Sequence, residues 1–219
     1  MEHGQNVLNA LSKLKDRRTA VSQSAKALIE TGGGNLFRVD LFTIGAAKRT
    51  VSLAAGFDLL VRAYNLVCAR SLIRMQLDTT LRFSALSLVA DPDAFADAVL
   101  SDERIDKLVD RDGKQLRDAY LVEKLTHVAP WIPEVYKRTS GYVHLSGQHI
   151  FSSVQAMDHE QRTIVMLVGE EDRQFPEWSW LEMINCFEAS VAMFVGQLRA
   201  WEDIKKGGNH GAHINTTTV

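Results

Sequence analysis

Four charged residues at four-residue intervals, Arg70, Arg74, Asp78 and Arg82, form the first group in this sequence that could do chemistry. In a helix this spacing places side chains on one face, and here the row begins in the middle of the apolar face and winds outward. A guanidinium keeps its charge in a protein, so a buried arginine needs carboxylates, carbonyls or a bound anion. The row therefore predicts either an internal ion network or an anion site, and in the second case Asp78 and Arg82 would bind substrate.

A second polar row, Tyr136, Ser140 and His144, has the same spacing. In a helix it aligns a phenol, a hydroxyl and an imidazole, which can position a proton donor or acceptor near neutral pH. The alternative is that His144 is a hydrogen-bonded core histidine and Ser140 only spaces helices. If this face meets the arginine row, the two rows form one polar pocket.

The spacing of other reactive residues disfavours several kinds of chemistry. His144 and His149, with Cys68 and Cys186 elsewhere, do not match metal-ligand spacing, so we predict no metal and no cofactor. No Gly-x-Ser-x-Gly elbow supports triad hydrolysis at Ser140. The chain also lacks a Gly-x-Gly-x-x-Gly motif, and the glycines at 32–34 are not followed by the Lys-Ser/Thr of a phosphate-binding loop.

The elements that must position these residues are mostly helices, because apolar residues recur every three or four positions. We predict a mainly α fold, a helical bundle with one small β-hairpin near residues 150–168. The predicted helices cover 4–30, 36–90 with Gly45 or Gly56 as candidate interruptions, a short stretch capped by Asp91-Pro92-Asp93, 116–127, 133–146, and the segment from Pro176-Glu177 to Gly207.

The remaining segments are expected to connect these helices. The β-branched runs Ile150–Val154 and Thr163–Val168 predict the two strands of the hairpin. The glycines at 32–34 predict a hinge, and the charged stretch 101–114 predicts a solvated surface excursion.

We expect a single helical domain over residues 1–206, in which helix 4–30 could form a separate arm, and a flexible tail over 207–219. Large aromatic residues of the last helix are typical of a core or a dimer face, and we favour the dimer face. These residues are Trp178, Trp180, Phe187 and Trp201.

Composition narrows the class of protein. The 219 residues include 25 Lys and Arg against 27 Asp and Glu, which gives a net charge of −2. This balance disfavours a general nucleic-acid or membrane-surface binder, so any RNA contact would be local. Two cysteines in apolar sequence favour a reducing compartment, and the start of the chain does not read as a signal peptide. We therefore expect a cytoplasmic protein without membrane contact.

The segment Leu66–Arg82, with its Arg-x3-Arg-x3-Asp pattern, and the Tyr136-x3-Ser-x3-His144 pattern resemble uncharacterised helical bacterial families that are similar to the HEPN superfamily. That superfamily is helical, often dimeric, and includes metal-independent ribonucleases of toxin and phage-defence systems with an Arg-x4–6-His motif. Arg138 and His144, with five residues between them, match that motif. The resemblance implies a homodimer that acts on RNA.

The same resemblance implies roles for the two polar rows. His144 would exchange a proton with the ribose 2′-hydroxyl or the leaving oxygen, an arginine would stabilise the phosphate, and Tyr136 and Ser140 would orient the scissile group. Arg138 and His144 are about 240° apart around a regular helix, so Arg70 or Arg74 is the better partner for His144.

Three hypotheses follow. The first is a HEPN-like metal-independent ribonuclease or toxin-type effector. The second is a non-catalytic binding or regulatory module with an anion or nucleotide pocket. The third is a dimerising scaffold in which the polar cluster only fixes packing.

Overall fold

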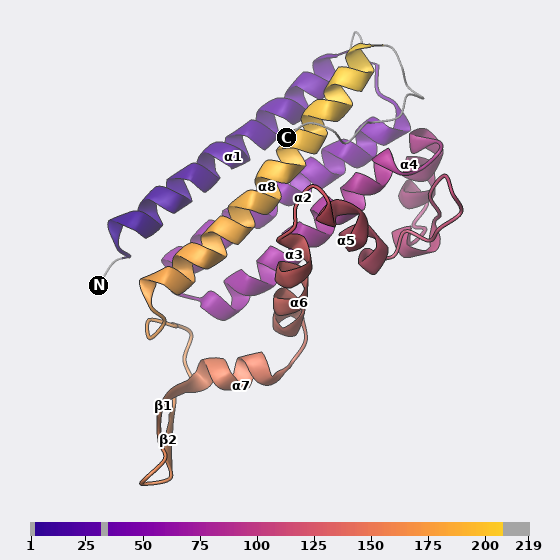
Figure 1. Cartoon of the computed structure of the whole chain (residues 1–219). Helices are drawn as coiled ribbons and strands as arrows, with labels where there is room; N and C mark the ends of the chain where they lie inside the picture. Colours follow the sequence, from indigo (N-terminus) through magenta and orange to yellow (C-terminus); the bar gives the residue numbers. More distant parts are fainter. Residues whose placement is uncertain (1–2, 32–34, 208–219) are drawn as a thin grey trace.

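The computed structural model describes residues 3–31 and 35–207, and it is a helical bundle with one small hairpin, as predicted. Four long helices form the bundle: α1 (Gln5–Glu30), α2 (Arg38–Arg62), α3 (Leu66–Ser84) and α8 (Glu177–Lys206). Helix α8 packs against α1 and α3, and α2 packs against the same two helices, so the four surround one core (Figure 1). Helix α1 is thus part of the bundle and not a separate arm.

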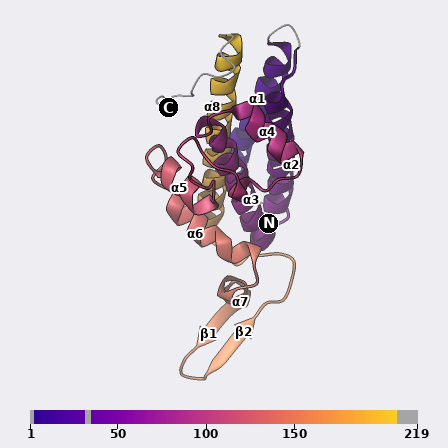
Figure 2. The ribbon, with the colours of Figure 1, turned by 90° about the vertical axis from the view of Figure 1, so that its right-hand side faces the viewer.

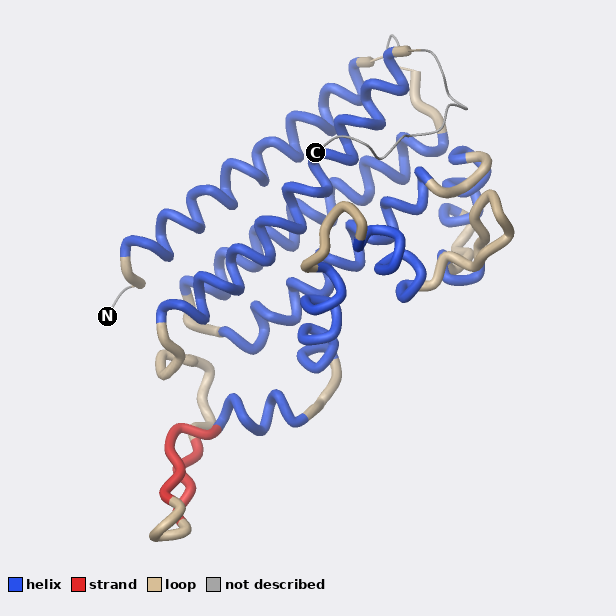
Figure 3. The backbone as a smooth tube through the Cα atoms, in the orientation of Figure 1, coloured by secondary structure: helices blue, strands red, loops and turns tan. Residues whose placement is uncertain are grey.

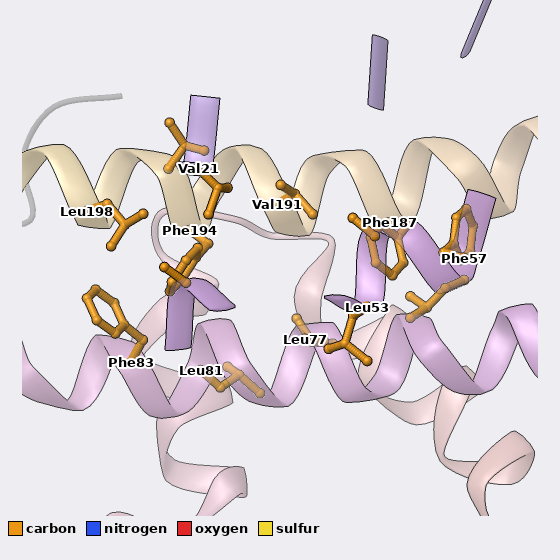
Figure 4. Close-up of a cluster of buried hydrophobic side chains, with 14 of the residues drawn as sticks. Val21, Leu53, Phe57, Leu77, Leu81, Phe83, Phe187, Val191, Phe194 and Leu198 are labelled. Atoms are coloured by element: carbon orange, nitrogen blue, oxygen red, sulfur yellow. The ribbon is translucent and has the colours of Figure 1, made fainter. Parts of the chain in front are cut away.

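The core consists of apolar side chains that recur every three or four residues on these helices. Phe187, Val191 and Phe194 of α8 are fully buried against α1, α2 and α3 (Figure 4). The rings of Phe57 and Phe187 stack with centroids 4.2 Å apart. Burial of each such side chain contributes about 1.5–3 kcal/mol, which explains why the long helices assemble along their whole length.

The prediction of one long helix over 36–90 is wrong, because the chain reverses direction between α2 and α3. Tyr64 adopts a left-handed conformation with φ 57°, and the Asn65 side chain caps α3 by accepting from the Cys68 N–H at 3.0 Å. Gly45 and Gly56 lie inside α2 without interrupting it. An interior glycine costs only about 1 kcal/mol relative to alanine, and packing offsets this cost.

A second layer of short helices covers one side of the bundle. Helix α4 (Pro92–Leu100) packs on α2, whereas α5 (Asp118–Thr126) and α6 (Ile132–Val143) pack on α3. The 3-10 turns η1 (Ala85–Ser87) and η2 (Ile105–Lys107) connect this layer. Asp91 caps α4 with Pro92 in its first turn, as predicted.

The charged stretch 101–114 is more than a solvated excursion, because it contains a buried carboxylate. Asp110 accepts hydrogen bonds from the N–H groups of Asp112 and Lys114 and from the Tyr120 hydroxyl. Burial pushes the pKa of Asp110 up, but these hydrogen bonds outweigh it and hold the pKa below its usual value. Burial beside Asp110 raises the pKa of Tyr120 to about 12.

The hairpin region differs from the prediction at its first strand. The stretch predicted as a strand, 150–154, is mostly helix α7 (Gly147–Ser153), capped by the Ser146 side chain. Strands β1 (Val154–Asp158) and β2 (Thr163–Met166) follow and pair antiparallel. Figures 1 and 2, seen from two directions, show that α7 and the hairpin project beyond the end of the bundle, and Figure 3 shows the strands as the only red segment.

Two predictions lie outside the described residues: the hinge at 32–34 and nearly all of the tail at 207–219. In the ranges 3–31 and 35–207, none of the helices combines the length and the apolar character needed to cross a membrane.

Candidate functional site

The arginine row and the Tyr136–Ser140 face meet where α3 packs against α6. Arg74 donates from NH1 to Ser140 Oγ at 2.6 Å and from Nε to Asp78 Oδ1 at 2.8 Å. Its guanidinium also lies 3.6 Å from the centroid of the Tyr136 ring. A single cation on α3 is therefore shared between a carboxylate on its own helix and two side chains on α6.

Asp118, at the start of α5, completes this polar cluster and was missed at the sequence level. It accepts two hydrogen bonds from Arg82, each 3.2 Å long, and lies 3.8 Å from Arg74 NH2. The Tyr136 hydroxyl points at the same carboxylate, 3.5 Å away. Two arginines are thus balanced by two aspartates. The position of Asp118 in the first turn of a predicted helix gives no signal that it would face α3.

Partial burial shifts the pKa values of two side chains in this cluster. Burial raises the pKa of Asp78, although the adjacent Arg74 acts in the opposite direction. Burial also raises the pKa of Tyr136, again against the effect of Arg74. Each nitrogen of Arg74 already faces an oxygen, and the side chain is only 13% exposed, so this guanidinium is poorly placed to receive a second anion.

Arg70 lies one turn away from this cluster and has different neighbours. It donates to the Tyr142 hydroxyl and, at 2.9 Å, to Ser179 Oγ at the start of α8. Its guanidinium lies 5.0 Å from the Tyr142 ring centroid and 5.6 Å from that of Phe175. Arg70 has no ion pair within residues 3–31 and 35–207. Its role is to join α3 to α6 and α8.

His144 and Arg138 are not part of either group. Helix α6 ends at Val143 instead of Ser146, so His144 has an extended backbone and is exposed, and it has no hydrogen-bond or ion-pair partner among the described residues. Arg138 is 66% exposed and pairs with Glu134 and Glu182. The predicted alignment of Tyr136, Ser140 and His144 is therefore wrong at its last member, because the helix stops one residue before it.

A second candidate site is an apolar groove of about 560 Å³ along α8. Small residues of α8 at four-residue intervals, Ala192, Gly196 and Ala200, line its α8 side. Larger side chains from η1, α5 and the following turn line it as well, among them Leu86, Leu125, Val128 and Trp131. This concave surface is mostly apolar and, unlike the polar cluster, has room for a ligand.

Two charged residues, Arg17 of α1 and Glu188 of α8, also line the groove. Arg17 donates from Nε to Glu188 Oε1 at 2.6 Å, and Lys13 pairs with the other carboxylate oxygen at 3.3 Å. Lys13 and Arg17 are 61% and 40% exposed, whereas Glu188 is 10% exposed. The accessible charge at this end of the groove is therefore positive.

One polar group beside the groove is unsatisfied. Gln197 lines the groove, and its buried Oε1 has no hydrogen-bond partner in the part of the chain that the structure describes. The sequence contained one signal for this site: three small residues, at positions 192, 196 and 200, interrupt the large apolar residues of the last helix.

Across the described residues, no group of three or more His, Cys, Asp or Glu side chains is placed to bind a metal ion. Comparisons of the chain with protein-family models, with curated proteins and with solved structures give no significant match. The function must therefore be argued from the two sites themselves.

Proposed function

We propose that this chain is a non-catalytic helical binding module and that its site is the α8 groove. The ligand we propose is an elongated apolar molecule with an anionic head. The observation that carries the proposal is the open apolar volume of about 560 Å³, which falls within the range of about 300–1,000 Å³ typical of small-molecule sites. In this proposal the polar cluster around Arg74 has a structural role, because it holds α3, α5 and α6 together.

Gly196 leaves room for a ligand at this position. A Cβ added at Gly196 would have no atom within 4 Å, so the chain itself does not require a glycine there. A glycine in the middle of a helix nevertheless costs about 1 kcal/mol relative to alanine. A ligand lying directly against the α8 backbone would benefit from the missing side chain.

The choice of an anionic head follows from the charges at the α1 end of the groove. Lys13 and Arg17 face the single carboxylate of Glu188, which leaves one positive charge in excess. Only Nε of Arg17 is used in its hydrogen bond to Glu188, so the terminal nitrogens of this exposed guanidinium can donate to a carboxylate.

A thermal-unfolding experiment with three twelve-carbon probes tests the proposal. Dodecanoate, dodecanol and dodecylamine share one chain and differ in the head group, and each is used below its micelle concentration. We expect dodecanoate to raise the unfolding temperature most and dodecylamine least, because a ligand stabilises the folded state in proportion to RT ln(1 + [L]/Kd).

Two leucine variants identify the groove as the place of binding. Gly196→Leu puts a side chain into the groove, and the shift should disappear. Gly45→Leu is the matched control, because Gly45 is also an interior helical glycine with open space around its Cβ. An equal shift in Gly196→Leu and wild type, or no shift with any probe, would overturn the proposal.

The HEPN-like ribonuclease hypothesis stays a prediction. It requires His144 beside an arginine and a phosphate, and His144 lies beyond the end of α6, exposed and without a partner among the described residues. RNA cleavage by wild type but not by His144→Ala would favour this hypothesis over the binding module. Equal cleavage by both proteins, or by neither, would end it.

A further inference from the structure

The hairpin and the residues around it expose large apolar side chains that the bundle does not cover. All residues of β2 are exposed, and so are Leu167 and Val168 immediately after it. Val168 is 95% exposed and Phe151 of α7 is 73% exposed. Side chains on adjacent strand positions point to opposite faces, so both faces of β2 present apolar groups to solvent.

A two-stranded hairpin without a covered face is at best marginally stable in water. Strands that are apolar on both faces are typical of sheets that are buried on both sides. The composition of β2 therefore fits a strand that gains further contacts in an assembly, because among the described residues β1 is the only strand paired with it.

The edge of β2 that faces away from β1 is suited to pair with another strand. The Leu167 N–H donates to Ser153 O at 2.7 Å, on the β1 side. Because backbone groups alternate in direction along an antiparallel strand, the N–H groups of Ile164 and Met166 point to the open edge. Natural edge strands are usually protected by charges, prolines or bulges, and Thr163–Val168 contains no charge and no proline. The irregular register in this hairpin lies in β1, between Val154 and Ala156.

We propose that the partner of this edge is the segment Thr163–Val168 of a second copy of the chain, that is β2 and the two residues after it, paired antiparallel about a two-fold axis. Such an axis pairs the strand with the same strand of the second copy. The uncharged segment Thr163–Val168 then lies opposite uncharged residues only. In the register centred on Met166, Arg162 and Glu170 of the partner subunit flank the paired segment at both ends, just outside residues 163–168. The segment is therefore complementary to itself in charge as well as in polarity.

Exposed apolar side chains beside this edge are available to a dimer interface. A stable interface removes about 800 Å² from each partner, and the large apolar side chains of this region, each more than a third exposed, can contribute to it. They are Leu145, Ile150, Phe151, Met157, Ile164, Val165, Met166, Leu167 and Val168.

Mass measurement of the full chain tests the proposal. By sedimentation equilibrium at micromolar to submillimolar concentration, the 24.5 kDa chain should give twice its mass. The variant Ile164→Lys/Met166→Lys should be monomeric, with dissociation at least ten-fold more favourable and the helical circular dichroism signal unchanged. Leu59→Lys is the control, because this leucine of α2 is also strongly exposed but distant from the hairpin in sequence and element. A monomeric wild type, or a double variant that remains dimeric, would overturn the proposal.

Hydrogen exchange on the unmodified protein tests the edge itself. As protein concentration rises, the amides of Ile164 and Met166 should become protected, whereas those of the exposed loop at 159–161 should not. Unchanged exchange at both positions in a dimer would overturn pairing through this edge. Co-sedimentation of the monomer with phosphatidylcholine and phosphatidylglycerol vesicles, abolished in the double lysine variant, would likewise overturn it and assign the surface to a membrane.

A charge exchange tests the register. Arg162→Glu should weaken the dimer several-fold by placing two glutamates opposite each other, and Arg162→Glu/Glu170→Arg should restore it. Failure of the second change to restore the dimer would overturn the register centred on Met166.

Discussion

Two of the ion networks among the described residues of this bundle differ in depth. Near the C-terminal end of α8, Lys205 pairs with Asp40 of α2 at 2.8 Å, and their side chains are 1% and 0% exposed. Lys205 also donates to Leu28 O at 3.0 Å and Asn35 O at 2.9 Å. The cluster around Arg74 is shallower, since the side chains of its two aspartates are each 22% exposed.

In the deep pair, Asp40 and Lys205 both make nearly all the hydrogen bonds that their charged groups can form. Asp40 accepts from the Trp201 indole at 3.2 Å and from the Phe37 N–H at 2.9 Å, in addition to Lys205. Water cannot replace a lost partner at this depth, whereas it can reach the aspartates of the shallower cluster. The cost of breaking an ion pair should therefore follow its burial more than its number of contacts.

The largest expected effect is that of Lys205→Met. The change leaves the Asp40 carboxylate buried without its cation, and such losses cost about 3–5 kcal/mol. Urea unfolding measures it, with Lys206→Met as the control, because that neighbour is 55% exposed and pairs at the surface. Adding Asp40→Asn to Lys205→Met should recover part of the loss. If Lys205→Met lowers the free energy of unfolding by less than about 1 kcal/mol, the deep pair contributes no more than an exposed ion pair does, and the expected difference between the two networks is contradicted.

The second effect is that of Arg74→Met, which we expect to lower the free energy of unfolding by about 2 kcal/mol, the range for hydrogen bonds to charged groups. The control is Arg138→Met on α6, where the ion pairs are exposed and should contribute less than about 1 kcal/mol. Equal losses for both variants in the same urea titration would show that the cluster does not hold α3 to α6.

The smallest effect concerns pH and compares Asp78 with Asp110. The pKa of Asp78 is raised in the folded state, so its contribution is most favourable below the unfolded pKa near 3.8 and is lost as pH rises through the folded pKa. The free energy of unfolding of wild type minus that of Asp78→Asn should therefore fall as pH rises from about 3.8 through the raised folded pKa.

The pKa of Asp110 is lowered, so its contribution is present above the unfolded pKa and is lost as pH falls through the folded pKa. The free energy of unfolding of wild type minus that of Asp110→Asn should therefore rise with pH. Slopes of the same sign for both variants would contradict the opposite directions of the two pKa shifts.

Much of the fold was predictable from local pattern. The cap formed by Asp91 and Pro92 was recognised because it depends on neighbouring residues only. The turn at Tyr64 was missed because Tyr has no preference for a positive φ, and the nearby glycines were more conspicuous breakers. The end of α6 at Val143 was missed for a related reason: the Ser146 cap of the next helix occupies the stretch that the prediction had assigned to α6.

The candidate site was less predictable. The spacing of Arg74 and Asp78 showed that they share a face, but the part played by Asp118 depends on how α5 packs. The groove depends on α1, η1, α5 and α8 together, so the small residues of α8 could not indicate it alone.

The sequence by itself determined the helical content, the presence of a hairpin and the charged row, because each depends on residue spacings of two to four positions. Tertiary structure decided which charges are deeply buried and which small residues line an open groove. Asp40 and Lys205 are far apart in the chain, and no short-range rule links them. Their pairing arises only when α2 and α8 pack, and that packing is driven by non-directional burial of apolar surface.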